Sequence, residues 1–296
     1  MATYNVSSGQ IASNVISAGD IEIVSSGGAT QDQYNYGQRF VSSGAIVRNG
    51  VVSGGGKDYI SSGGSSYQGV ILGGGIRYVS GGGTANNPYI RSGGTVSAAS
   101  GATVLAVSAF SGGVLSAADG AVISGGTVAA GAAITAASGT ILTGTITNSG
   151  SISGGVLSGA GTTLVVSSGA TLANQTIGSG ASATLQAYAS AGTNLVISGG
   201  TLDLYTNNTT STTIVGTGGN FILESGVTFT ATSGNYATSG NTITVNSGAV
   251  LSGSHISSGG TINVQGGVVS STVVDGGTLN VYTPTGGTNN TTFTSN

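Results

Sequence analysis

Few residues of this chain could carry acid–base or ionic chemistry. Its 296 residues include eight acids, five lysines or arginines and one histidine, His255. The acids are Asp20, Glu22, Asp32, Asp58, Asp119, Asp203, Glu224 and Asp275. Enzymes that cleave polysaccharides hold two carboxylates, or a carboxylate and a cation, close to each other. A site of that kind requires a fold that brings these scattered groups together.

Charged residues recur at equivalent places in four successive segments. They are Glu22, Arg39, Asp58 and Arg77, so the sign of the charge alternates from one segment to the next. If the segments stack as coils, these side chains form a row with steps of ~4.8 Å. We interpret the row as exposed and as a device that sets register, each pair contributing about 0 to 1 kcal/mol. Ion-pair networks often imitate catalytic sites, so we assign no catalytic residue; a catalytic cluster is the alternative interpretation.

A second, mostly aromatic row is expected beside the charges. The residues that follow the four charges are Ile23, Phe40, Tyr59 and Tyr78. Neighbouring residues of a strand point to opposite faces. With the charges outside, the rings are therefore expected inside, as part of the core. Stacked tyrosines on a surface would instead offer a face for sugars or for a partner rod.

The spacing of Ser-Gly and Gly-Gly pairs reveals the elements that position these rows. An aliphatic residue precedes each pair in the first third of the chain. These residues are Val41, Val52, Ile60, Ile71, Val79 and Ile90, at steps of 11, 8, 11, 8 and 11 residues. The two steps sum to a repeat of 19, which is too short to enclose a core and must stack on copies of itself. The repeat therefore predicts a solenoid.

Composition decides which kind of solenoid this is. The chain has 57 glycines and only two prolines, and glycine does not recur every third residue as it does in collagen. Glycine costs about 1 kcal/mol relative to alanine inside a helix, so helical repeats are excluded. Equivalent segments run in the same direction in successive coils. We therefore predict an all-β, parallel β-helix with coils of about 19 residues.

One architecture is expected to run through the whole chain, as a single β-solenoid over 1–296. Residues 1–95 have the most regular repeats, and 96–200 are rich in alanine and glycine. Residues 201–240 are expected to form irregular coils or an insertion, because the Ser-Gly rhythm is lost there. The rhythm returns over 241–296.

Several classes of function are disfavoured by what the chain lacks. The five cations cannot form the basic stripe that nucleic acid requires. Without cysteine, neither a disulfide nor a thiolate metal site is possible, and His255 has no second histidine as a zinc partner. Calcium-binding repeats need an aspartate in every coil. We expect no metal and no cofactor, and neither a signal peptide nor a membrane-spanning helix is visible.

The repeat units resemble a known family. The segments YISSGGSSYQGVILGGG (59–75), FVSSGAIVRNGVVSGGG (40–56) and IVSSGGATQDQY (23–34) are similar to the AIDA-type repeat in passenger domains of self-associating autotransporter adhesins of Gram-negative bacteria. The resemblance implies a right-handed parallel β-helix on the cell surface or secreted, noncatalytic, that mediates adhesion or cell–cell aggregation. It further implies three partners: like copies of the chain, a host-cell or glycan surface, and a glycosyltransferase that modifies repeat Ser or Thr.

Two other functions remain open. A polysaccharide-binding or polysaccharide-degrading β-helix protein is the alternative, and an enzyme would need a groove with at least two acids of perturbed pKa. An ice or crystal binder would need Thr-x-Thr in every coil, whereas the motif is sporadic, as at 143–147 and 228–230.

Overall fold

The computed structural model describes residues 1–191, 195–207, 213–230 and 236–282. Within these residues the chain forms strands and turns, and no helix. It divides into two compact units, 1–155 and 156–296. Parts of the predicted irregular segment, 208–212 and 231–235, lie outside the described residues, as do 192–194 and 283–296.

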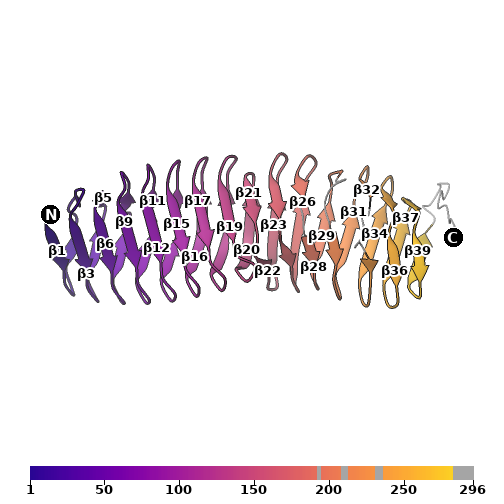
Figure 1. The fold of residues 1–296 in the computed structure, drawn as a ribbon, viewed down its shortest axis with the longest axis horizontal. Coiled ribbons are helices and arrows are strands. Elements are labelled where there is room, and N and C mark those ends of the chain that lie inside the picture. Colours follow the sequence, from indigo (N-terminus) through magenta and orange to yellow (C-terminus); the bar gives the residue numbers. More distant parts are fainter. Residues whose placement is uncertain (192–194, 208–212, 231–235, 283–296) are drawn as a thin grey trace. The chain divides into compact units, whose positions relative to one another are not determined.

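In the first unit, three rows of strands pair in parallel along successive coils (Figure 1). The first row is β1 (Thr3–Val6), β3 (Ile21–Val24), β6 (Gln38–Val41), β9 (Lys57–Ile60), β12 (Ile76–Val79), β15 (Thr95–Ala98), β17 (Val114–Ala117), β19 (Ala133–Ala136) and β21 (Ser151–Ser153). The second row is β2 (Ile11–Ala12), β4 (Ala29–Gln31), β7 (Ile46–Arg48), β10 (Ser65–Tyr67) and β13 (Thr84–Asn86). The third row is β5 (Tyr34–Asn35), β8 (Val51–Val52), β11 (Val70–Ile71) and β14 (Tyr89–Ile90). The longer strands β16 (Thr103–Ala109), β18 (Val122–Val128) and β20 (Ile141–Asn148) then continue the second and third rows together.

The second unit also consists of short strands that pair in parallel. Its strands are β22 (Val156–Leu157), β23 (Thr162–Val166), β24 (Thr171–Ala173), β25 (Thr176–Ile177), β26 (Ala181–Leu185), β27 (Ser190–Ala191), β28 (Leu195–Ile197), β29 (Thr201–Leu204), β30 (Thr213–Val215), β31 (Asn220–Leu223), β32 (Thr228–Thr230), β33 (Tyr236–Ala237), β34 (Thr242–Asn246), β35 (Val250–Ser252), β36 (His255–Ser257), β37 (Thr261–Gln265), β38 (Val268–Ser270), β39 (Val273–Asp275) and β40 (Thr278–Tyr282). Strands β26, β29, β31, β34, β37 and β40 pair in parallel in chain order.

The strand register confirms the predicted parallel solenoid. Gln38 of β6 pairs with Lys57 of β9, which pairs with Ile76 of β12, so each coil takes 19 residues. Earlier coils are shorter, because Ile21 pairs with Gln38 at a step of 17 residues. Backbone groups of each strand are thus satisfied by the next coil and not within the coil itself.

One column of the core consists of the aliphatic residues that end most strands of the first row; buried residues of the second and third rows, such as Val47 and Val52, complete it. Val41, Ile60 and Val79 are fully or almost fully buried, and Ala98 and Ala117 take the same position in later coils. A coil therefore shares its apolar interior with the coils before and after it, which is why a single coil could not fold alone.

Glycine forms the corner after each of these strands for two separate reasons. Gly27, Gly44 and Gly63 all have a φ of +73°, a conformation in which a side chain costs about 1–2 kcal/mol. In addition, a Cβ at Gly27 would lie 2.5 Å from Oγ of Ser8, a serine of the preceding coil. The repeated Ser-Gly pair thus lets successive corners stack closely.

No helix in the described part of the chain is long and apolar enough to cross a membrane.

Candidate functional site: a buried charge row and exposed side-chain columns

The four recurring charges form a continuous row inside the first unit. Glu22, Arg39, Asp58 and Arg77 occupy paired positions on β3, β6, β9 and β12, and each is 0% exposed. We call these four residues the charge row. The expectation that they lie on the surface is therefore wrong.

The phase of the alternation explains the error. Val41 precedes the glycine corner and must be inside, so Arg39, two residues earlier on the same strand, is inside as well. Phe40, between them, points outward. The prediction that neighbouring residues face opposite sides was correct. Which set faces inward is decided by the aliphatic residue at the corner and not by the usual preference of charges for solvent.

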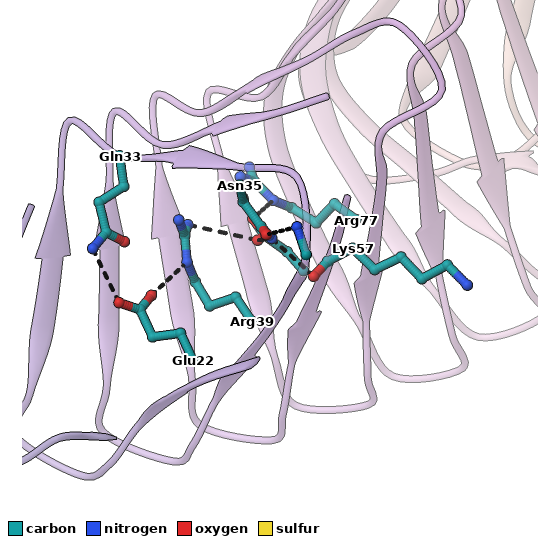
Figure 2. Close-up of polar contacts among 8 residues, drawn as sticks. Glu22, Gln33, Asn35, Arg39, Lys57 and Arg77 are labelled. Atoms are coloured by element: carbon teal, nitrogen blue, oxygen red, sulfur yellow. Dashed lines mark hydrogen bonds and ion pairs between the residues drawn. The ribbon is translucent and has the colours of Figure 1, made fainter. Parts of the chain in front are cut away.

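Ion pairs hold the charge row together (Figure 2). Arg39 Nε donates to Glu22 Oε2 at 2.9 Å, and Arg77 Nη2 donates to Asp58 Oδ2 at 2.9 Å. A longer ion pair of 3.5 Å joins Arg39 Nη1 to Asp58 Oδ1. The sign alternates along the row, so each charge has an opposite charge as its neighbour, which is the condition for burying ions at all.

Two amide side chains complete the row from another face of the coil. Gln33 Nε2 donates to Glu22 Oε1 at 3.0 Å, and Asn35 Nδ2 donates to Asp58 Oδ1 at 2.8 Å. Figure 2 shows the Gln33 side chain reaching Glu22. Asn35 is also tied to the backbone through the carbonyl of Lys57 and the N–H of Gly37. The sequence analysis missed these amides, because their spacing from the acids, 11 and 23 residues backwards or forwards, matches no simple motif.

Two glycines that lie outside the corners leave space for the guanidinium groups of Arg39 and Arg77. A Cβ at Gly50 would lie 2.8 Å from Arg39 Nη1, and one at Gly69 would lie 2.5 Å from Arg77 Nη2. Neither glycine has a positive φ. Gly50 and Gly69 are therefore required by space, and glycine at these places is a signal in the sequence for a large buried neighbour.

The chemistry open to the charge row is structural. Burial tends to raise the pKa of Asp58, but the positive charges of Arg39 and Arg77 and the hydrogen bonds from Arg77 and Asn35 outweigh it and lower that pKa. Asp58 is thus held as a carboxylate that no dissolved substrate can reach. Arg39 Nη2 and Arg77 Nη1 are buried without a hydrogen-bond partner. The hydrogen-bonding capacity of the charge row is therefore not fully used.

The aromatic row lies on the outside, so the expectation that it packs in the core is also wrong. Phe40 and Tyr59 stack with ring centroids 4.8 Å apart, and Tyr59 and Tyr78 with centroids 5.1 Å apart. Phe40 is 37% exposed, and both tyrosines are half-buried. We call Phe40, Tyr59 and Tyr78 the aromatic row.

The same outward column continues with hydroxyl side chains in later coils. Tyr78 pairs with Ser97, then Ser116 and then Thr135, and these three side chains are half-buried or exposed. Each first-row strand presents two outward side chains, and the column that contains the aromatic row begins with Asn5 and Ile23 and ends in hydroxyl-bearing residues.

The corners add a second exposed column of hydroxyls. Ser8, Ser26, Ser43 and Ser62 are exposed, and each lies over the positive-φ glycine of the following coil.

Another aromatic cluster, missed in the sequence, lies on the third-row face. Tyr34 stacks on Tyr36 and Tyr89 on Phe110, each pair with centroids 6.4 Å apart, and the Arg91 guanidinium carbon lies 5.7 Å from the Phe110 ring centroid. A shallow hollow of about 300 Å³ lies between Tyr34, Tyr36 and Arg91, with an aliphatic floor.

The acids of the second unit show one perturbed group. Burial, and after it the negative charge of Glu224, raise the pKa of the Asp203 carboxyl on β29. Glu224 accepts a hydrogen bond from Asn246 Nδ2 at 2.9 Å. His255 lies half-buried on β36. Within the described ranges no group of three or more His, Asp or Glu side chains could hold a metal ion.

Fold and surface together define a parallel β-solenoid whose outer faces carry repeating columns of like side chains. No family model matches the chain, and no curated protein matches it. Among solved structures it is similar to the crystal structure of the TibC-catalysed, hyper-glycosylated TibA55-350 fragment, with 25% sequence identity and a TM-score of 0.46. The alignment covers 96% of this chain and 98% of that fragment.

Proposed function

We propose that the protein is a secreted or surface-displayed, noncatalytic adhesin that mediates adhesion or cell–cell aggregation on a Gram-negative bacterium. The observation that carries this proposal is the exposed aromatic row, Phe40, Tyr59 and Tyr78, with its continuation as hydroxyl side chains in later coils. Stacked rings left on a surface are typical of faces that bind a partner.

Repetition favours association over catalysis. Each coil offers one or two weak contacts, and a rigid repeat multiplies them into avidity when the partner surface is itself repetitive. A like copy of the chain, a host-cell surface and a glycan surface all meet that condition. Four of the charged residues, which a catalytic site would need in reach of its substrate, are instead buried in the charge row.

The exposed hydroxyl column supports modification as part of the same function. Ser26, Ser43 and Ser62 recur at equal positions in successive coils, so one glycosyltransferase could modify each of them by the same mode of recognition. We include O-glycosylation of repeat Ser or Thr in the proposal, as the sequence resemblance implies.

Removing the aromatic row should weaken aggregation. The test displays the chain on cells and compares the parent with the triple variant Phe40→Ser, Tyr59→Ser and Tyr78→Ser, which gives these coils the side chains of later ones. We expect a several-fold slower settling of cells, because the rings supply apolar contact area. The matched control, Tyr34→Ser with Tyr36→Ser, removes exposed rings from another face and should settle like the parent. Parental settling of the triple variant would reject the proposal.

A further inference from the structure

We propose that a polar trough on the second-row face of the first unit binds a neutral oligosaccharide; this rests on the proposed function, for which it names a ligand class. The trough is a hollow of about 320 Å³. Its lining consists of Gln31, Arg48, Asn49, Tyr67, Gln68, Asn86 and Asn87. We call it the amide trough, because most of these side chains are amides.

The strand register builds the trough from four successive coils. Gln31, Arg48, Tyr67 and Asn86 are paired in this order at the ends of β4, β7, β10 and β13. They are exposed, or half-buried in the case of Asn86. Three steps of ~4.8 Å place the outer members roughly 14 Å apart, a length that suits a short oligosaccharide rather than a single sugar.

The residues beside this column hold a costly backbone conformation. Asp32, Asn49, Gln68 and Asn87 each follow a member of the column, and their φ values are 53°, 50°, 51° and 49°. Asn and Asp tolerate a positive φ better than other side chains, but Gln does not share that tolerance. Glycine would remove the cost at every one of these positions.

Later coils of the same unit show that glycine is compatible with this place in the fold. The equivalent positions are Ala106, with a φ of 49°, and then Gly125 and Gly144, with φ of 66° and 70°. Within the first unit, polar side chains are thus kept alongside the trough at positions where the backbone favours glycine; in the second unit, Asn174 and Ser271 also have a positive φ. Strained polar residues that border one hollow in successive coils point to a use of their side chains.

The amides have hydrogen-bonding capacity to spare. Asn49 Nδ2 donates to Asp32 Oδ1 at 3.0 Å, whereas the side chains of Gln68, Asn86 and Asn87 form no hydrogen bond within the described part of the protein. Each amide offers two donors and one oxygen acceptor, which matches neighbouring sugar hydroxyls that both donate and accept.

The tyrosine ring of the trough and the balance of charges around it favour a neutral glycan as the ligand. The exposed ring of Tyr67 stands in the middle of the column and can pack against the apolar face of a sugar. Arg48 lines the trough, and Asp32, which accepts a hydrogen bond from Asn49 of the lining, carries the opposite charge at its border. The trough and its border together therefore have no net charge to select an anionic ligand. The few convergent polar groups around a ring are typical of a small-molecule site.

The test measures binding of the full chain to an array of neutral hexose and N-acetylhexosamine oligosaccharides of two to six units, with uronic-acid and sialylated oligosaccharides alongside. The variant Gln68→Gly with Asn87→Gly removes two amides and their strain. Its affinity should fall roughly tenfold, the effect of losing two or so hydrogen bonds, while its Tm stays equal or rises. The matched control Ala106→Gly makes the same backbone change outside the trough and should bind like the parent.

Three results would overturn the proposal: no neutral oligosaccharide is bound, only the acidic ones are bound, or the double glycine variant binds as tightly as the parent. Cell aggregation and adhesion to host cells are measured on the same variants. Glycan binding by a parent that neither aggregates nor adheres would reject the proposed function and leave the trough intact. Aggregation without glycan binding would reject the trough alone.

Discussion

Asp58 is a carboxylate in the interior of the solenoid, held there by two guanidinium groups and one amide. Arg77 and Asn35 donate hydrogen bonds to it, and Arg39 adds a longer ion pair. Breaking a buried pair by removing one partner typically costs about 3–5 kcal/mol, because the remaining charge is left uncompensated. The charge row therefore makes the stability of the first unit depend on pH.

The lowered pKa of Asp58 gives the sign of this dependence. The folded state holds the proton less tightly than the unfolded state, so Asp58 contributes stability at pH above its ordinary pKa, and this is lost as pH falls through the lower, folded pKa. Asp58→Asn should cost about 3–5 kcal/mol at pH 7 and less at pH 3, which lies below the ordinary Asp pKa of about 3.9. Urea unfolding at both pH values measures this difference.

The exposed acid Asp119, in the same unit, provides the control for Asp58. Asp119→Asn should change the free energy of unfolding by less than about 0.5 kcal/mol at either pH. A cost of Asp58→Asn that is equal at pH 7 and pH 3 would show that the carboxylate charge is not what stabilises the row.

For single residues, the sequence was enough to predict which of them share a row, but not whether the row faces the core or the solvent. The spacing from Glu22 to Arg77 was enough to place the charges together. Their burial depends on partners from other strands, Gln33 and Asn35, and on the space left by Gly50 and Gly69. Such contacts join positions that no local pattern connects.

Stacked corners are elements at which successive coils approach closely. Gly63 follows β9 with a φ of +73°, and its Cα hydrogen faces Oγ of Ser43 in the preceding coil. Gly63 is required both for its positive φ and for its close approach to Ser43. Substitutions can separate the two requirements, because only the close approach involves Ser43.

Gly63→Ala should destabilise the first unit by more than the 1–2 kcal/mol that a positive φ costs alone, since the new Cβ meets Ser43 Oγ. Adding Ser43→Ala should recover part of the loss and leave the backbone cost. A double-mutant cycle of thermal unfolding gives the coupling between the two positions. A coupling of zero would mean that stacking of the corners does not require glycine.

The strands themselves were predicted well. The segments 21–28, 38–44, 57–64 and 76–82 read as versions of one strand and corner, and each begins with a strand of the first row, β3, β6, β9 or β12. Glycine corners and β-branched residues carry that signal locally. The positive φ of Asn49 and Gln68 was not foreseen, because neither residue type marks that conformation as glycine does.

Association between whole molecules would draw on the outward columns of side chains. In the first unit one such column contains the aromatic row and goes on through Ser97 and Ser116. Every coil then adds a similar amount of binding free energy, and the total over all coils sets the avidity. The predicted division of 1–296 into more and less regular stretches of one solenoid stays a prediction at this scale.

Deletion of whole coils tests the central claim, that adhesion is the sum of many equivalent coil contacts. Removing residues 95–113 joins Gly94 to Val114, and removing 95–132 joins it to Ala133; both joints keep the strand register. Protease resistance of the displayed chain checks that each shortened solenoid still folds. Cell aggregation should fall stepwise, with a larger loss for two coils than for one. Complete loss after one deletion, or after a single surface substitution, would contradict the account, as would no loss after either deletion.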